Sequence, residues 1–349
     1  MSAPSGVVEP TPRGAPAATK ASLVGRWVAF WDEREPPTVL ALIRISLALV
    51  VLVDLASVAA AGAAPWLWAP GAAGAVSLWD MADAPLFYRV FAASAASAQL
   101  LWGGLVLSIL CVGLGCCTGL AALVHVCLSV QTALINGPGD RAIDRIIRIV
   151  LLILVFSPAG KIWSLDARWR TGSFRGALAS APAWPRYLIL GQLVVMYCGA
   201  GLAKGGTSWY PWGGYRALYL TLQDPILAAA DFRWLAQPVP YFATRLATAL
   251  THLWELAAPL VLVAAYYRRR SDRGGRLQRL VQRLPVRNVY VAVGVLFHLT
   301  LAATLRLGIF PFAMLACFPA FFRPDELARL GFWLRRAVSP RGDTSGRAG

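Results

Sequence analysis

Long apolar blocks recur along this chain, and their length is the strongest constraint on its fold. A helix needs about 20 apolar residues to cross roughly 30 Å of hydrocarbon, because each residue adds about 1.5 Å. Several blocks reach or approach that length, the first over residues 38–60. Hydrophobic residues make up 58% of the chain and charged residues 14%, which is fewer charges than soluble domains carry. The sequence therefore predicts membrane spans rather than buried core helices.

The blocks divide into about eight predicted transmembrane helices, which indicates an all-α, polytopic integral membrane helical bundle. The last block, residues 289–322, is too long for one straight helix, and Gly308 and Pro311 interrupt it. We therefore split it there into two spans. The other predicted spans cover residues 38–60, 98–114, 118–135, 144–156, 187–204 and 244–266.

Positive charge is concentrated between the predicted spans. The formal net charge is +16, which in a soluble protein would raise the question of nucleic-acid binding. Cytoplasmic loops of membrane proteins are enriched in lysine and arginine, and residues 268–287 fit that pattern. We therefore predict a multi-pass protein of the cell membrane with both termini in the cytoplasm. Its expected partners are the bilayer, with anionic lipid at the basic loops, and no nucleic acid.

Composition also predicts the segments around the bundle. Residues 1–21 are rich in proline, alanine, glycine and serine, and we expect a disordered cytoplasmic tail. Residues 22–34 place large aromatic side chains on one face, as an interfacial amphipathic helix does. The transmembrane domain is expected over residues 38–325, followed by a basic cytoplasmic tail over residues 326–349. The six cysteines show neither a disulfide framework nor metal-ligand spacing, so no metal site is predicted.

Ionisable side chains inside or at the edges of the predicted spans are candidates for a functional site. Each costs at least about 2.5 to 3.5 kcal/mol near the bilayer centre, so such groups usually face a bundle interior or an aqueous cavity. His125 stands alone on its span, and we expect it to bond a neighbouring helix. The full set is Arg44, Asp54, His125, Arg145, Arg148, Lys204, His252, Glu255 and His298.

Two interpretations stand for the most suggestive of these residues. His252 and Glu255 are three residues apart on one helix face, where the carboxylate can orient or charge the imidazole, or where both can serve as a structural pair between helices. Lys204 can extend its ammonium to the interface, or it can act as a base in a dry pocket. Trp209 and Trp212 fit an aromatic belt or the roof of a pocket above Lys204.

Two motifs resemble a known membrane family. The segment YCGAGLAKGGTSWYPWGG, residues 197–214, resembles the A-G-x-x-K segment, followed by Trp and Gly, of the vitamin K-dependent gamma-carboxylases and their bacterial relatives, the horizontally transferred transmembrane (HTTM) domain proteins. The segment FHLTLAATLRLGIFPFAMLACFPAFFRP, residues 297–324, is similar to a carboxylase segment with a Phe-His start, a Gly-x-Phe centre and Met-Leu-Ala-x-x-Pro. The resemblance covers about residues 38–325, which makes that region an expected HTTM-like transmembrane domain.

The resemblance implies a site at the external side of the membrane. By motif position, Lys204 corresponds to the carboxylase lysine that is understood as the base in the oxygenation of vitamin K hydroquinone. The implied cofactor is a reduced quinone of that kind. The predicted catalytic residues are Lys204, His252, Glu255 and His298, and the predicted cofactor-binding residues are Trp209, Trp212 and Gly214.

Departures from the carboxylase pattern leave the activity open. Gly137 follows Asn136 where carboxylases have an Asn-His pair, and Leu301 stands where they have an asparagine. No segment resembles their large luminal domain, so glutamate carboxylation is not expected.

Two hypotheses follow, and the substrate is open in both. A carboxylase-like membrane enzyme requires its candidate residues to converge in one cavity. A non-enzymatic accessory or maturation factor for a small peptide or lipid requires only a stable bundle and a binding groove, with Lys204 facing lipid or forming an ion pair. Transport ranks last, because no internal repeat is visible.

Overall fold

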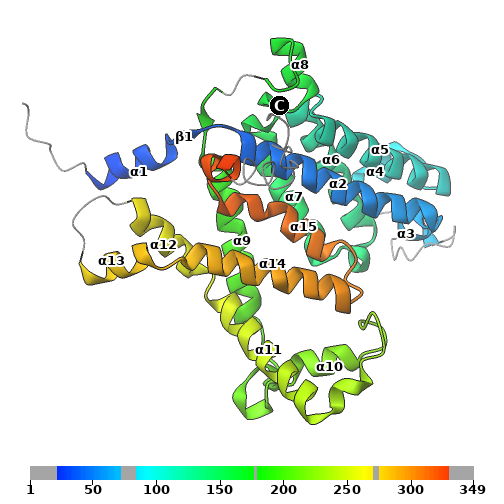
Figure 1. The fold of residues 1–349 in the computed structure, drawn as a ribbon. Helices are drawn as coiled ribbons and strands as arrows, with labels where there is room; N and C mark the ends of the chain where they lie inside the picture. Colours follow the sequence, from blue (N-terminus) through cyan, green and yellow to red (C-terminus); the bar gives the residue numbers. More distant parts are fainter. Residues whose placement is uncertain (1–21, 72–83, 177–178, 270–274, 330–349) are drawn as a thin grey trace, which may run out of the picture.

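The computed structural model describes residues 22–71, 84–176, 179–269 and 275–329, which form a helical bundle (Figure 1). These residues also contain one two-stranded antiparallel sheet, in which β1 Arg34–Glu35 pairs with β2 Ala181–Pro182. The predicted all-α class is confirmed. The predicted N-terminal tail and most of the predicted C-terminal tail lie outside the described residues.

Four described helices are long and apolar enough to cross a membrane, namely α2 Thr38–Ala60, α5 Ala95–Leu114, α6 Thr118–Ile135 and α14 Val286–Thr304. Together, α11 Pro238–Leu256 and α12 Pro259–Arg269 also have the required length and hydropathy, but they are bent by 50° at their junction. Pro259 starts α12, and a proline ring cannot continue the helical hydrogen bonding. The described chain therefore has four candidate spans, or five if the bent pair is one span.

Helices are also present at the remaining predicted spans. They are α7 Ala142–Val155, α9 Trp184–Leu202, and α15 Phe310–Cys317, which continues as η8 Phe318–Phe321. The 14 residues of α7 are short for a membrane crossing, and α9 carries a buried Arg186 in its first turn. Length and composition therefore show four or five candidate crossings, and the predicted eight are not shown by them.

Short helices connect the long ones. Helix α1 Leu23–Trp31 precedes the first long helix, and the α-helical connectors are α3 Ala64–Trp68, α4 Leu86–Val90, α8 Leu165–Thr171, α10 Ala217–Gln223 and α13 Arg276–Arg283. The 3₁₀ connectors are η3 Gly137–Gly139, η4 Pro158–Lys161, η5 Thr207–Trp209, η6 Pro211–Gly213 and η7 Arg233–Ala236.

Helix α2 lies in the middle of the core, where it packs against α5, α7, α9 and α15. Its Arg44 is fully buried and donates to the carbonyl oxygens of Val112 at 3.1 Å and Trp163 at 2.6 Å. Gly115 closes the turn between α5 and α6 with φ of +69°, and a Cβ there would lie 1.9 Å from the Arg44 guanidinium. Arg44 therefore ties helix ends together, which is a structural role.

The helices connect two ends of the molecule, at the left and right of Figure 1. The strand end holds the β1–β2 pair and the hydrogen bond from Arg186 to the Ala320 carbonyl oxygen, at 3.2 Å. The loop end holds α3, η3 and the loop that follows α14, where Arg306 donates to the Pro225 carbonyl oxygen at 3.1 Å. The polar cavity discussed below lies on the loop-end side of the bundle.

Candidate functional site

Lys204 forms an ion pair that joins two helices. It follows the end of α9, and its ammonium donates to a carboxylate oxygen of Glu255 near the end of α11. The two side chains are only 14% and 7% exposed. The ammonium is therefore paired inside the bundle rather than extended to the interface.

Aromatic rings cover this ion pair. The Lys204 ammonium nitrogen lies 4.4 Å from the centroid of the Trp209 ring, within the range of a cation–π contact. His252 meets the same loop, with its ring centroid 5.2 Å from that of Tyr210. Trp212 stacks on Tyr210 at 4.6 Å, and it is 74% exposed. The structure thus gathers three predicted catalytic residues under the predicted aromatic roof.

Two glycines and an arginine shape the loop that carries these rings. A Cβ on Gly213 would lie 2.0 Å from the Thr207 carbonyl oxygen, so the loop closes only over glycine. Gly214 adopts φ of +75°, a conformation that glycine accepts most readily. Its carbonyl oxygen accepts a hydrogen bond from Arg245 of α11 at 2.6 Å. The predicted Gly214 therefore lies next to the roof and acts on it through the backbone.

His298 belongs to a different cluster. It is fully buried, its Nε2 lies 2.6 Å from the Tyr197 hydroxyl, and its Nδ1 has no hydrogen-bond partner among the described residues. Phe310 and Phe318 pack around its ring. Trp254, the neighbour of Glu255, touches Tyr197 at 4.7 Å between ring centroids. The two clusters are thus adjacent, but His298 does not join the Lys204 group.

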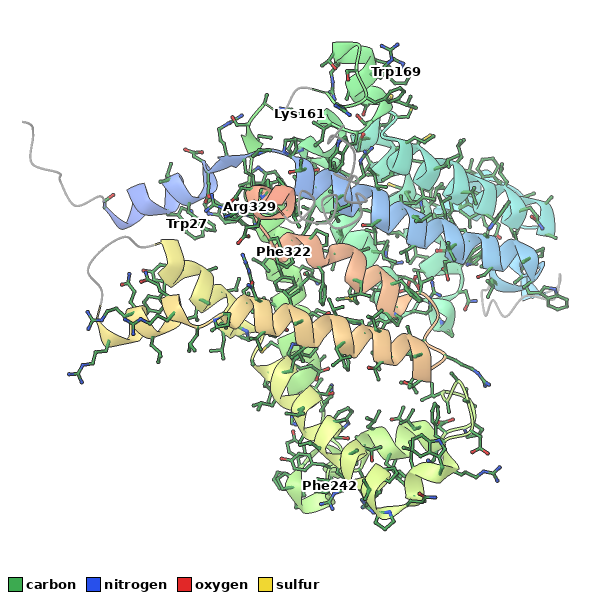
Figure 2. All side chains as sticks on the ribbon, viewed as in Figure 1. Trp27, Lys161, Trp169, Phe242, Phe322 and Arg329 are labelled. Atoms are coloured by element: carbon green, nitrogen blue, oxygen red, sulfur yellow. The ribbon has the colours of Figure 1, made fainter. Side chains whose placement is uncertain are left out.

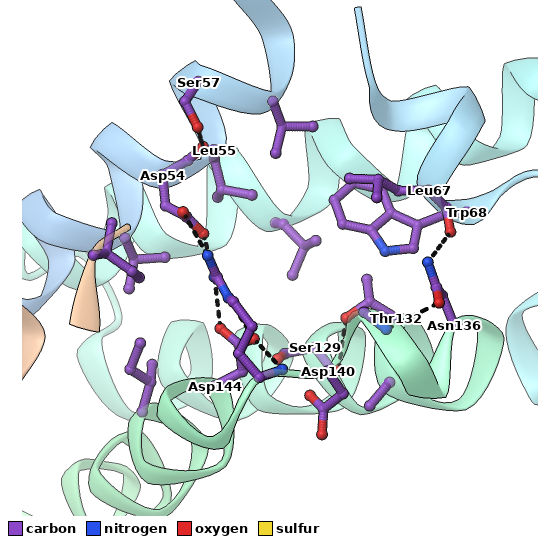
Figure 3. A pocket seen from close by; sticks show the side chains of 18 of the residues that line it. Asp54, Leu55, Ser57, Leu67, Trp68, Ser129, Thr132, Asn136, Asp140 and Asp144 are labelled. Atoms are coloured by element: carbon purple, nitrogen blue, oxygen red, sulfur yellow. Dashed lines mark hydrogen bonds and ion pairs between the residues drawn. The ribbon is translucent and has the colours of Figure 1, made fainter. Parts of the chain in front are cut away.

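A polar cavity of about 310 Å³ opens elsewhere on the loop-end side, between α2, α3, α6 and α7 (Figure 3). None of the predicted catalytic residues lines it. The predicted catalytic residues are also absent from the walls of two other prominent cavities of the described chain. The polar residues of this cavity are Asp54, Ser57, His125, Ser129, Thr132, Asn136, Asp140, Arg141 and Asp144.

Arg141 is held between two carboxylates at this cavity. Its guanidinium donates to both oxygens of Asp54, at 3.0 and 2.6 Å, and to both oxygens of Asp144, at 3.0 and 2.8 Å. These bonds raise the pKa of the guanidinium, with Asp144 contributing most. Asp54 and Asp144 face each other across the cavity in Figure 3. The triad joins α2 to the start of α7 and carries one net negative charge.

A second ion network lies behind the cavity wall and reaches it through Asp140. Asp140 accepts from Arg148 at 2.8 Å and from Arg145 at 3.1 Å. Burial by itself raises the pKa of the Asp140 carboxyl, but the hydrogen bonds and charges of the two arginines lower it below its ordinary value. One carboxylate between two guanidiniums leaves one net positive charge, opposite in sign to the triad.

Neutral polar groups also border the cavity. Asn136 donates to the Leu67 carbonyl oxygen and accepts from the Gly139 amide, both at 3.0 Å. His125 is 3% exposed, and its Nδ1 lies 3.0 Å from the Ser108 hydroxyl on α5. The expected bond from His125 to a neighbouring helix is therefore present. Both hydrogen bonds described for this ring use Nδ1.

The sequence predicted several residues of this site individually but did not predict that they lie together. Asp54, His125, Arg145 and Arg148 were predicted as ionisable groups inside or at the edges of spans. Arg141 was missed, although its position at the start of a span, on the same side as Asp54, was a usable signal. Tyr197, the partner of His298, was missed as well, because nothing in its spacing indicates the contact.

Comparison with known families gives one match. The model of the HTTM domain matches residues 33–266, which include the Lys204 cluster and almost all of the polar cavity. His298 and the similarity noted over residues 297–324 lie beyond that match. Neither curated proteins nor solved structures give a significant match. Among the described residues, no group of three or more His, Cys, Asp or Glu side chains is placed to hold a metal ion.

Proposed function

Because this chain belongs to the HTTM domain family, we propose that it is a non-enzymatic membrane factor that binds a small dipolar ligand in the polar cavity. The ligand class is a zwitterion or the charged end of a small peptide. An accessory or maturation role fits a protein that holds such a ligand without transforming it. The observation that carries this proposal is the charged wall of the cavity, which the Arg141 triad lines and where Asp140 links it to the two arginines behind it.

The charged groups of the cavity are suited to recognition rather than to proton transfer. Every carboxylate that lines it is already bonded to an arginine. The hydrogen bonds from the guanidinium must break before such a carboxylate can accept a proton from a substrate. The net negative charge of the triad attracts the positive end of a dipolar ligand, and the net positive charge of the Asp140 network attracts its negative end.

The ion pair of Lys204 with Glu255 also supports a non-enzymatic role. A general base needs a free lone pair within reach of its substrate. The Lys204 nitrogen instead donates to Glu255 and lies against Trp209. An ion-paired Lys204 is the arrangement expected of the accessory hypothesis.

The proposal includes eight spans with both termini in the cytoplasm. Support comes from the alternation of helix ends between the strand end and the loop end, and from the basic segments near the strand end, such as α13. In this arrangement α7 and α15 cross with the help of the 3₁₀ turns that follow them. The polar cavity then faces the outside of the cell.

Sidedness and cavity access can be tested together. Thr132→Cys places a thiol in the cavity wall, and Ser173→Cys places one in the exposed loop after α8 at the strand end. With the six native cysteines replaced by alanine, we expect a membrane-impermeant thiol reagent to label Thr132→Cys in intact cells, and Ser173→Cys only after permeabilisation. A mixture of short peptides should slow the labelling of Thr132→Cys. The reverse labelling pattern, or no slowing by any peptide, would contradict the proposal.

A carboxylase-like enzyme is the second candidate, and the gathering of Lys204, His252 and Glu255 beneath Trp209 favours it. It would use a reduced quinone, with Trp209 and Trp212 against the cofactor. The test measures quenching of tryptophan fluorescence by reduced naphthoquinones in nanodiscs, and their consumption, for wild type and Lys204→Ala. Consumption that depends on Lys204 would overturn the non-enzymatic proposal. Absence of both binding and consumption would remove the quinone hypothesis.

A further inference from the structure

A second large cavity lies at the strand end, far from the polar one. Its volume is about 480 Å³, and it is enclosed by the end of α1, the first turns of α9, α12 and the η8 region. Aromatic and aliphatic side chains form most of its wall, including Phe30, Trp31, Leu190 and Val261. Phe30 stacks on Tyr187 at 4.9 Å between ring centroids. The interior suits a hydrocarbon chain.

The cavity is open toward the surface that α12 presents to lipid. Leu262 and Tyr266 line it, yet they are 40% and 53% exposed. Exposed apolar residues on a membrane-associated helix contact acyl chains rather than water. Figure 2 shows Trp27 of α1 and Phe322 beyond η8 on this side of the molecule. An acyl chain can therefore enter sideways from the bilayer.

Arginines outnumber acidic residues in the cavity wall. Arg186, Arg287 and Arg323 line it, with Glu326 as the acidic member of the set. Arg186 is bonded to Glu35 at 2.6 Å and Arg287 to Glu326 at 2.7 Å, so both are engaged. Arg323 differs, because its side chain is 58% exposed and its contact with the equally exposed Asp325 is 3.4 Å long. A contact of that kind contributes little stability, and the guanidinium can turn to a phosphate.

A basic helix adjoins this site. Helix α13 packs against α12, and its Arg276, Arg279 and Arg283 are exposed. Their spacing of three and four residues places them on one face. Basic amphipathic helices of this type attract anionic headgroups.

We propose that the strand-end cavity is a specific site for an anionic phospholipid, with an acyl chain inside it and the phosphate at Arg323. The apolar wall supplies affinity for any lipid, and the arginines select the negative headgroup. This inference does not depend on the ligand of the polar cavity, and it locates the lipid at one site rather than along all basic loops.

Gly191 offers a direct test, because it lines the cavity and an added Cβ would meet nothing within 4 Å. Gly191→Leu should therefore fill the space without straining the fold. Gly199→Leu on the same helix is the matched control, since a Cβ there also meets nothing and Gly199 lies outside the cavity lining. Both changes favour helix formation.

The measurement is native mass spectrometry of the full chain, taken from vesicles of equimolar phosphatidylglycerol and phosphatidylcholine. We expect wild type and Gly199→Leu to retain phosphatidylglycerol preferentially, and Gly191→Leu to retain at least tenfold less. Arg323→Gln should lower the preference about fivefold, the effect of one basic residue near an anionic surface. Equal retention of the two lipids by wild type, or unchanged retention by Gly191→Leu, would overturn the proposal.

Discussion

The Lys204 pair and the Arg141 triad are both ionic links between helices, yet they differ in what surrounds them. The Lys204 and Glu255 side chains are 14% and 7% exposed and lie under Trp209. Arg141 is 44% exposed and borders a cavity of about 310 Å³. A closed pair leaves no room for a ligand and serves to join helices. An open triad keeps its charges within reach of one, so the cavity rather than the motif lysine is the better binding site.

The largest effect is expected at the closed pair. Glu255→Leu leaves the Lys204 ammonium buried without its partner, and loss of one member of a buried pair costs about 3 to 5 kcal/mol. The double variant Lys204→Met with Glu255→Leu should recover most of that loss, because no charge is then stranded. Thermal unfolding in detergent of Glu255→Leu, Lys204→Met and the double variant measures these losses of stability. A double variant as unstable as Glu255→Leu would show that the loss of stability does not come from an unpaired buried charge.

A smaller effect is expected at the open triad. Asp54→Asn removes one carboxylate, but Asp144 still neutralises Arg141, and the guanidinium is partly hydrated. We expect a stability loss below about 1 kcal/mol. Labelling of Thr132→Cys should nevertheless lose its sensitivity to peptides, because the cavity loses the net charge of the triad. Loss of stability as large as that of Glu255→Leu would erase the distinction between the two regions.

Acidification should weaken the cavity network at Asp140. The Arg148 and Arg145 guanidiniums lower the pKa of its carboxyl despite burial. A lowered pKa means that the stabilisation is complete above the unfolded-chain value of about 3.9, and is lost as the pH falls through the folded value. The difference in melting temperature between wild type and Asp140→Asn should therefore shrink as the pH falls below about 4. A constant difference from pH 6 to pH 3 would show that Asp140 is not ionised in the fold.

Local patterns predicted much of the fold, and tertiary contacts account for the rest. The run over residues 38–60 coincides with α2, and the 118–135 run coincides with α6, because hydropathy and helix periodicity are local properties. The span expected over 244–266 is instead α11 and α12, which bend before Pro259. The three-residue spacing of His252 and Glu255 predicted that both lie on one helix face, and in the structure both meet the Lys204 loop. The pairing of Asp54 with Arg141, 87 residues away, depends on how helices pack, which spacing along one helix does not encode.

The smallest effect is expected at Arg145, one of the two arginines that donate to Asp140. Arg145 is 68% exposed, whereas Arg148 is 13% exposed and also donates to the Ser129 carbonyl oxygen at 3.3 Å. Solvent screens an exposed pair, so Arg145→Gln should change stability by less than about 0.5 kcal/mol. Arg148→Gln, the matched variant, should cost clearly more and should shift the pH dependence at Asp140 further toward that of an ordinary carboxyl. Equal effects of the two substitutions in thermal unfolding would mean that exposure does not set the strength of these pairs, and the contrast between the open and closed regions would lose its physical basis.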